Sequence, residues 1–357
     1  MKRIGFLSFG HWADVPGSRV PTASEAYRQA VELAVAAEEV GADGAFFRVH
    51  HFARQSAAPF PLIAAAAART RRIELGTAVI DMRYENPLAM AEEAAITDLL
   101  SDADGAGGRL QLGISRGSPE PALRGWEAFG RRAEDGATDA DLARATTELF
   151  RAAIAGAGVA LSDPAVTGQS RPLPITPLSP GLPERIWWGA GSRATAVWTA
   201  EQGMNLMSST LLTEDTGVPF GDLQAEQIRL YREAWAAVGH DRTPRVSVSR
   251  SIVPIIDDES RRYFGVRAQA DAHDQVGYLD ASTLARFGRA YIGEPDVIAE
   301  ELAADAAVRD ADTLLVTVPN QLGVDFNARL LEAIVRHVKP VLESAGAAVP
   351  AGAVVAG

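Results

Sequence analysis

The chain has 357 residues, of which 47% are hydrophobic and 22% are charged, so it can bury a sizeable core as one large domain or two ordinary ones. Its net charge of −12 argues against nucleic acid or an anionic membrane as the main partner, and an anionic ligand would need a local pocket of positive potential. Because there is no cysteine, disulfides, thiolate catalysis and cysteine-ligated metal sites are excluded.

The histidines and the apolar runs narrow the class of protein further. The six histidines show no metal-ligand spacing, so we expect no metal site. We find no apolar signal region and no stretch of about 20 apolar residues, and we therefore expect a cytoplasmic protein.

Short apolar runs alternate with amphipathic runs along almost the whole chain. Strands are expected at 3–9, 45–49, 73–80, 110–115, 185–190, 205–208, 246–256 and 313–318. Helices are expected at 24–40, 62–69, 87–100, 142–154, 193–202, 223–238, 295–307 and 325–338. This repeated alternation predicts an α/β fold with a parallel sheet and crossover helices, and eight such units fit a closed (β/α)8 TIM barrel with insertions better than an open sheet.

The domain organisation follows from where the alternation breaks. We expect a single barrel domain over residues 1–345 and a flexible C-terminal tail over 346–357. Residues 156–184 are rich in Pro, Gly and Ser and have no period, which indicates a long loop insertion, a natural lid or substrate wall. Residues 258–290 are ambiguous and are expected to be partly helical.

Two strand ends carry most of the chemical information, because ligands bind at the carboxyl ends of parallel strands. The run Asp-Gly-Ala-Phe-Phe-Arg-Val ends in His50 and His51, and the run Arg-Leu-Gln-Leu-Gly-Ile-Ser ends in Arg116. Imidazoles on one strand and a guanidinium on another indicate a site for an anionic cofactor and for proton chemistry. The other residues at strand ends are His11, Asp81, Arg83, Gly191, Ser192, Ser208, Ser209, Arg250 and Asn320.

The segment Trp-Trp-Gly-Ala-Gly-Ser-Arg-Ala-Thr at 187–195 is the best candidate phosphate site. Gly189 and Gly191 would let the backbone approach a ligand closely, and Ser192 is a natural N-cap for the helix that follows. Thr195 lies one turn later, so both hydroxyls can face one phosphate at the helix start. The segment also matches a dinucleotide fingerprint, but the next strand ends in Met-Ser-Ser-Thr without the acidic residue that a ribose requires, so a monophosphate is favoured.

Each of these features also has a purely structural explanation. Arg116 could pair with a carboxylate on a neighbouring loop, and Gly189 and Gly191 could form an ordinary strand-to-helix turn. Trp187 and Trp188 are expected to pack in the core rather than against a ligand.

Taken together, the segments resemble, in order, the bacterial luciferase-like, flavin-dependent monooxygenases. The match runs from about residue 3 to about residue 340. The segments that carry it are Val-His-His-Phe at 49–52, Ile-Glu-Leu-Gly-Thr-Ala-Val at 73–79, Asn-Pro-Leu-Ala-Met-Ala-Glu-Glu at 86–93, Gly-Arg-Leu-Gln-Leu-Gly-Ile-Ser-Arg-Gly at 108–117, Gly-Ala-Gly-Ser-Arg-Ala-Thr at 189–195 and, more weakly, 291–302.

The resemblance implies a barrel that binds reduced FMN or a relative at its strand carboxyl ends. It assigns the catalytic histidine to His50, the phosphate-binding groups to Arg116, Ser192 and Thr195, and a cis peptide under the flavin ring to Ala78 and Val79. Members usually have an acidic residue directly before the two histidines; here it is Val49, which leaves the pairing of His50 open.

The function that the resemblance implies is an FMN-dependent monooxygenase. It would receive reduced FMN from a flavin reductase and use dioxygen to oxygenate a small organic substrate, commonly as a homodimer that packs early helices together. Two alternatives stay open: a deazaflavin-dependent oxidoreductase that performs hydride transfer on the same scaffold, and a non-catalytic flavin-binding protein. The barrel loops set the substrate, and one sequence does not reveal which loop residues touch it.

Overall fold

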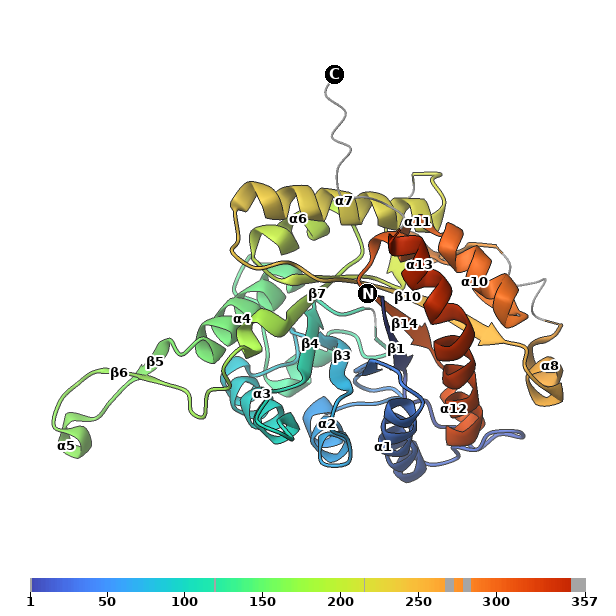
Figure 1. Ribbon diagram of the computed structural model, residues 1–357. Helices are drawn as coiled ribbons and strands as arrows, with labels where there is room; N and C mark the ends of the chain where they lie inside the picture. The colour runs from blue at the N-terminus through green and yellow to red at the C-terminus, as the bar shows by residue number, and fades with distance from the viewer. Residues whose placement is uncertain (1, 119, 215, 267–272, 279–283, 348–357) are drawn as a thin grey trace, which may run out of the picture. The chain divides into compact units, whose positions relative to one another are not determined.

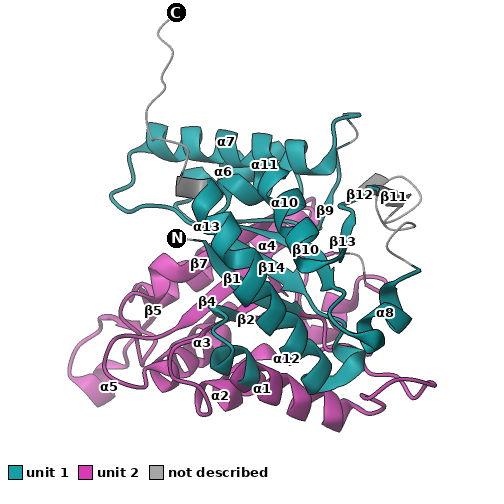
Figure 2. Cartoon of the chain, turned by 45° about the vertical axis from the view of Figure 1, so that its right-hand side comes forward, with its two compact units in different colours: residues 1–7, 36–44, 190–357 teal, residues 8–35, 45–189 magenta. Residues whose placement is uncertain are grey.

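The computed structural model (Figure 1) describes residues 2–118, 120–214, 216–266, 273–278 and 284–347. The contacts between residues divide the chain into two compact units (Figure 2). Unit 1 comprises residues 1–7, 36–44 and 190–357, and unit 2 comprises residues 8–35 and 45–189. A single domain over residues 1–345 stays a prediction. The predicted tail over 346–357 lies outside the described residues from 348 onward.

Unit 2 contains four strands of a parallel sheet, and most of their residues are buried. They are β2 (Gly44–Phe47), β3 (Glu74–Asp81), β4 (Leu110–Ser115) and β7 (Ile186–Ala190). β3 pairs with β4, and β4 pairs with β7. Leu75 and Leu112 are fully buried, as expected for strands covered by helices. Trp187 lies in the core as predicted, and its Nε1 donates to Gln111 Oε1 at 2.9 Å.

Two of the longer helices of unit 2 begin at residues whose side chains cap them. The helices of unit 2 include the first part of α1 (Ala23–Glu39), α2 (Pro59–Ala67), α3 (Pro87–Ser101), η1 (Gly125–Phe129), α4 (Asp139–Ile154) and η2 (Leu182–Arg185). The Asn86 side chain accepts hydrogen bonds from two backbone amides of the first turn of α3. Thr138 and Asp141 form a capping box, so α4 begins three residues before the predicted Leu142, because the first turn is polar and lies outside the apolar period.

A buried carboxylate ties three elements of unit 2 together. Asp98 of α3 is fully buried and accepts hydrogen bonds from Leu110 N at 3.0 Å and from Ser179 Oγ at 2.6 Å. It also forms an ion pair with the Arg185 guanidinium of η2. A Cβ atom on Gly108 would lie 2.1 Å from Asp98 Oδ1, so glycine is required where the chain passes this carboxylate.

The aperiodic segment predicted as a loop insertion contains regular structure. β5 (Gly158–Leu161) and β6 (Pro172–Pro174) form an antiparallel pair around the short helix α5 (Pro164–Thr167). Figure 1 shows this hairpin reaching away from α4. Its strands are too short and too exposed to show an apolar alternation, which is why the sequence does not reveal them. Its role as a lid stays a prediction.

Unit 1 is built around four parallel strands, β1 (Arg3–Ser8), β14 (Thr313–Thr317), β10 (Val246–Pro254) and β8 (Asn205–Ser208), paired in that order. β13 (Ala290–Gly293) adds to β10. A second, antiparallel sheet contains β9 (Leu211–Leu212), β12 (Leu284–Phe287) and β11 (Gln275–Tyr278), so the ambiguous region 258–290 holds strands as well as the helix α8 (Asp258–Phe264). The other helices are α6 (Arg193–Glu201), α7 (Phe220–Val238), α10 (Pro295–Ala304), α11 (Ala306–Asp310), η3 (Asn320–Leu322), α12 (Gly323–Ala333), the π-helical η4 (Ile334–Val338) and α13 (Lys339–Ala347).

The strand order defines the fold class. It runs β13-β10-β14-β1-β2-β3-β4-β7-β8, and β10 also pairs with β8. Without β13 this is a cyclic order of eight parallel strands with helices between them, which is the predicted (β/α)8 TIM barrel.

Candidate active site

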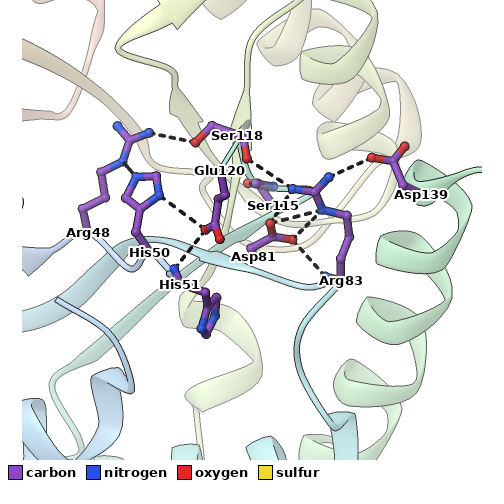
Figure 3. A network of polar contacts seen from close by, with 10 residues as sticks. Arg48, His50, His51, Asp81, Arg83, Ser115, Ser118, Glu120 and Asp139 are labelled. Carbon is purple, nitrogen blue, oxygen red and sulfur yellow. Dashed lines mark hydrogen bonds and ion pairs between the residues drawn. The ribbon is translucent and has the colours of Figure 1, made fainter. Parts of the chain in front are cut away.

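The chain that follows β2 holds polar side chains at the end of a buried strand of unit 2 (Figure 3). Arg48 N donates to Ser8 O at 2.9 Å, and His50 N donates to Ser56 O at 2.9 Å, so the backbone stays anchored beyond the strand. Figure 3 shows the side chains of Arg48 and His50 together, whereas the His51 ring points away from them.

The His50 ring lies between a guanidinium and a carboxylate. Arg48 Nε donates to His50 Nε2 at 2.6 Å, and His50 Nδ1 lies 3.4 Å from Glu120 Oε1. The same Glu120 oxygen accepts a hydrogen bond from His51 N at 3.1 Å, and Arg48 Nη2 donates to Ser118 Oγ at 3.2 Å. The carboxylate that the sequence lacks at Val49 is therefore supplied by the segment after β4.

Burial and charge set the protonation of this network. Burial lowers the pKa of Arg48 to about 10. Burial would raise the pKa of Glu120, but hydrogen bonds from His50 and from the His51 amide lower this pKa below its usual value. In the unfolded chain, the Glu120 carboxyl has its usual, higher pKa. The ionised carboxylate therefore stabilises the folded state above that pKa, and this stabilisation is lost as the pH falls through the lower pKa of the folded state. Glu120 is a charged acceptor at neutral pH.

His51 belongs to an aromatic cluster rather than to the polar network. Its ring stacks on Tyr84 with centroids 4.2 Å apart and meets Phe129 edge-on at 5.0 Å. Burial lowers the pKa of His51, which favours the neutral ring. Phe52 and Phe129 are each about half exposed at 54% and 51%, so the cluster also presents an apolar surface. The His50 ring nitrogens thus contact two ionised side chains, whereas the His51 ring packs against aromatic rings.

The strand-end residues Asp81 and Arg83 neutralise each other. Arg83 Nη2 donates to Asp81 Oδ2 at 2.6 Å, and Arg83 Nη1 donates to Asp139 Oδ2 at 2.8 Å. The guanidinium also lies over the Trp126 ring at 4.4 Å. Gly117 has φ +84°, and a Cβ atom there would lie 2.0 Å from the Asp81 carboxylate. Arg83 therefore offers no free charge to a ligand.

The peptide bond between Ala78 and Val79 is cis. The pairing of β3 with β4 shifts register between Thr77 and Ile80, so both residues stand outside the regular ladder. A Cβ atom on Gly189 would lie 3.2 Å from Val79 Cγ1, so this glycine makes room for Val79 rather than for a ligand. Contact of Ala78 and Val79 with a cofactor stays a prediction.

Arg116, directly after β4, differs from the other arginines of the site. It is exposed, and within the residues that the structure describes it forms no ion pair and no side-chain hydrogen bond. Among the described residues, no carboxylate on a neighbouring loop pairs with Arg116, so the structural explanation considered for this residue does not hold there. A free guanidinium in a chain of net charge −12 is a local attraction for an anion.

The predicted phosphate segment lies at the start of α6 in unit 1. Ser192 is its N-cap, and the Ser192 side chain accepts a hydrogen bond from Thr195 N at 3.3 Å. Ser192 Oγ and Thr195 Oγ1 lie 2.9 Å apart, so the two hydroxyls are adjacent as predicted. A Cβ atom built on Gly191 would lie 3.6 Å from Leu211 O, an ordinary van der Waals contact. Arg116 belongs to unit 2, whereas Ser192 and Thr195 belong to unit 1.

A carboxylate of the chain itself occupies part of this helix start. Arg193 N, the first helical amide, donates to Glu214 Oε2 at 2.8 Å. The Arg193 side chain pairs with the same carboxylate at 3.0 Å and with Glu226 at 3.2 Å. A phosphate at this helix must bind beside Glu214 or replace it at the amide.

Two other strand-end residues have structural roles in unit 1. Ser208 Oγ hydrogen-bonds to Gln227 Oε1 at 2.9 Å, and both side chains are buried. Arg250 is almost fully buried and pairs with Asp305 at 2.9 Å. Neither offers a free group for chemistry.

Sequence reasoning missed three charged residues: Arg48, Glu120 and Glu214. Arg48 lies inside an apolar run, and the two glutamates lie in segments without a period. One signal was present for Glu120, because the missing acid at Val49 implied that a partner for His50 had to come from another strand end.

Two further findings concern metal ligands and membrane-spanning helices. In the described part of the chain, no three His, Asp or Glu side chains form a group that could hold a metal ion. No helix among the described residues combines the length and apolar character needed to span a bilayer.

The fold defines a (β/α)8-barrel protein, with an imidazole after β2 and a guanidinium after β4 in unit 2, and a capped helix after β7 in unit 1. The chain belongs to the luciferase-like monooxygenase family, which matches residues 1–312. The oxygenase component of a flavin-dependent trigonelline monooxygenase from Acinetobacter baylyi is 26% identical over 237 residues, which cover 60% of this chain and 61% of that protein. The chain thus spans about three fifths of this relative's length.

Two solved structures share the fold. The oxygenating constituent of 3,6-diketocamphane monooxygenase from Pseudomonas putida, in complex with FMN, superposes with a TM-score of 0.70 and 18% identity over 96% of this chain and 98% of that one. An F420-dependent secondary alcohol dehydrogenase in complex with an F420-acetone adduct gives a TM-score of 0.59 and 15% identity over 96% of this chain and 99% of that one. Identities this low establish the barrel fold alone.

Proposed function

We propose that the chain is an FMN-dependent monooxygenase that uses reduced FMN and dioxygen to oxygenate a small organic substrate. The observation that carries the proposal is the exposed Arg116 guanidinium at the end of β4, which forms no ion pair or side-chain hydrogen bond with the described residues. The trigonelline relative is named as the oxygenase component of a flavin-dependent enzyme, which supports a separate flavin reductase as partner. The camphane relative's complex with FMN supports FMN as the cofactor.

The groups proposed to hold the ribityl phosphate are the Arg116 guanidinium of unit 2 and two hydroxyls of unit 1. Arg116 would fork onto the phosphate oxygens, and the adjacent Ser192 and Thr195 hydroxyls would donate hydrogen bonds to them. Gly191, which carries no side chain, would let the backbone approach the phosphate, and Ala78 and Val79 would contact the ring system. When bound, reduced FMN supplies the electrons that activate dioxygen.

His50 is the group that would hold or move a proton during the reaction. Its side chain is 12% exposed, so it is shielded from bulk water yet reachable from the strand ends. An imidazole can exchange a proton near neutral pH, and burial limits exchange with solvent. The Glu120 carboxylate would stabilise the ring when it carries a second proton.

The second candidate function is hydride transfer with a deazaflavin, and the fold shared with the F420-dependent dehydrogenase supports it. The two functions are separated by titrating the cofactor-free protein with reduced FMN and with reduced F420. Tight binding of reduced FMN and dioxygen consumption that depends on the protein would support the monooxygenase. Selective binding of reduced F420 and anaerobic oxidation of that cofactor by a substrate would replace it with the dehydrogenase.

Replacing Arg116 with alanine tests the phosphate contact. We expect FMN binding to weaken by about 10- to 100-fold, because hydrogen bonds to charged groups contribute ~1.5–3 kcal/mol. Binding of riboflavin, which has no phosphate, should change little. Calorimetric titration of both ligands measures this, with Arg71→Ala as the matched change of an exposed arginine in unit 2. An equal loss for both ligands would show that Arg116 does not contact the phosphate.

A homodimer is proposed from an exposed apolar stripe on α3. Ile96, Leu99 and Leu100 are 46%, 42% and 59% exposed, and their spacing places them on one side of the helix. We expect Leu99→Glu with Leu100→Glu to yield monomers in sedimentation experiments, because two charges would be buried without partners in the interface. Val166→Glu, at an equally apolar and more exposed position on α5, should leave the oligomeric state unchanged. A wild-type monomer would exclude the dimer.

A further inference from the structure

The neighbours of the His50 ring leave only one arrangement of its proton. An arginine side chain carries only donors, so the 2.6 Å contact from Arg48 Nε makes His50 Nε2 the acceptor. A carboxylate only accepts, so His50 Nδ1, which is 3.4 Å from Glu120 Oε1, carries the hydrogen. The two contacts select the same tautomer independently.

We infer that Arg48 and Glu120 are positioning residues for His50: Glu120 fixes a proton on Nδ1, and the Arg48 donor keeps the lone pair on Nε2. This inference rests on the proposed function only in giving His50 a part in catalysis. If His50 Nε2 were protonated, its N–H would face the Arg48 N–H, and two donors would meet. Arg48 therefore opposes protonation of Nε2. Glu120 favours it, because the carboxylate stabilises positive charge on the ring.

The pair therefore sets when His50 takes up a proton. A proton reaches Nε2 only when Arg48 releases the lone pair, and Ser118 Oγ, 3.2 Å from Arg48 Nη2, remains as a partner for the released guanidinium. The ring then carries two N–H groups, and the one on Nδ1 faces Glu120. Among the described residues, the other ionisable groups whose charge acts on this network include His11, His51, Asp81 and Tyr84.

The test is nitrogen NMR of the histidine rings in the full-length, cofactor-free protein. His240 provides an internal reference, because its Nε2 lies 2.8 Å from Ala200 O and a carbonyl oxygen only accepts, so that ring carries its proton on Nε2. The wild-type spectrum should show His50 and His240 as opposite tautomers. If His50 carries its proton on Nε2, the inference is overturned without any variant having to fold.

Two variants should move His50 in opposite directions. In Glu120→Gln we expect the ratio of protonated to neutral His50 ring at a fixed pH to fall by about tenfold, and in Arg48→Met to rise by about tenfold. The His240 signals should not change in either variant. A merely structural role would disturb both rings or shift both variants in the same direction, and either result would contradict the inference. If His50→Ala retained wild-type turnover while the wild-type protein showed the expected tautomer, the proposed role of His50 in catalysis would be wrong and the inference about its tautomer would stand.

Discussion

Replacing His50 with alanine is expected to lower turnover by about 10²- to 10⁴-fold, the range that a positioned acid or base contributes. Flavin affinity should change little, because His50 does not belong to the proposed phosphate site. The physical reason is the loss of a shielded imidazole nitrogen that can hold a proton beside Glu120. Anaerobic binding of reduced FMN and the rate of substrate oxygenation measure the two quantities separately.

A control substitution at another histidine tests whether the loss of turnover is specific to His50. His337 is exposed on η4 and contributes to no site described above, so His337→Ala should retain full turnover. Equal turnover of His50→Ala and the wild type would remove His50 from the mechanism. A parallel loss of flavin binding would instead assign His50 to the cofactor site.

Replacing Asp98 with alanine is expected to lower the free energy of unfolding by about 3 kcal/mol, because it leaves a largely buried guanidinium and a buried hydroxyl without their acceptor. Asp98 connects α3 with β4 and with η2 through Leu110, Ser179 and Arg185. Urea unfolding of the wild type and the variant measures the difference.

An exposed ion pair provides the contrast. Glu233 pairs with Arg229 one turn away at 2.7 Å, with both side chains more than half exposed, so Glu233→Ala should cost at most ~0.5 kcal/mol. Equal effects of the two substitutions would show that burial does not control the strength of the Asp98 network.

The barrel could be predicted because each strand is an apolar run and each helix an amphipathic one. The predicted strand at 110–115 matches β4, and the predicted helix at 87–100 ends one residue short of α3. The hairpin of β5 and β6 could not be predicted, since strands of three or four exposed residues carry no hydrophobic period. The period of apolar residues along the sequence therefore identifies helices and strands that bury one face in the core, and it misses elements that remain exposed.

The candidate site was predictable only in part, for a related reason. Arg116 directly follows β4, and His50 and Ser192 come shortly after β2 and β7, so the barrel rule points to them. Glu120 lies 70 positions after His50 in a segment of irregular backbone, and only folding brings its carboxylate to the ring. Arg48 was hidden because an arginine within an apolar run suggests no partner in advance.

The Glu214 carboxylate at the first amide of α6 makes anion binding there a competition inside one molecule. A tethered competitor behaves as if it were present at millimolar concentration, so any free anion must exceed that local supply before it occupies the amide. Simple inorganic ions are thus poor occupants of this helix end, and only a ligand held by additional contacts elsewhere can take the place of the tethered acid.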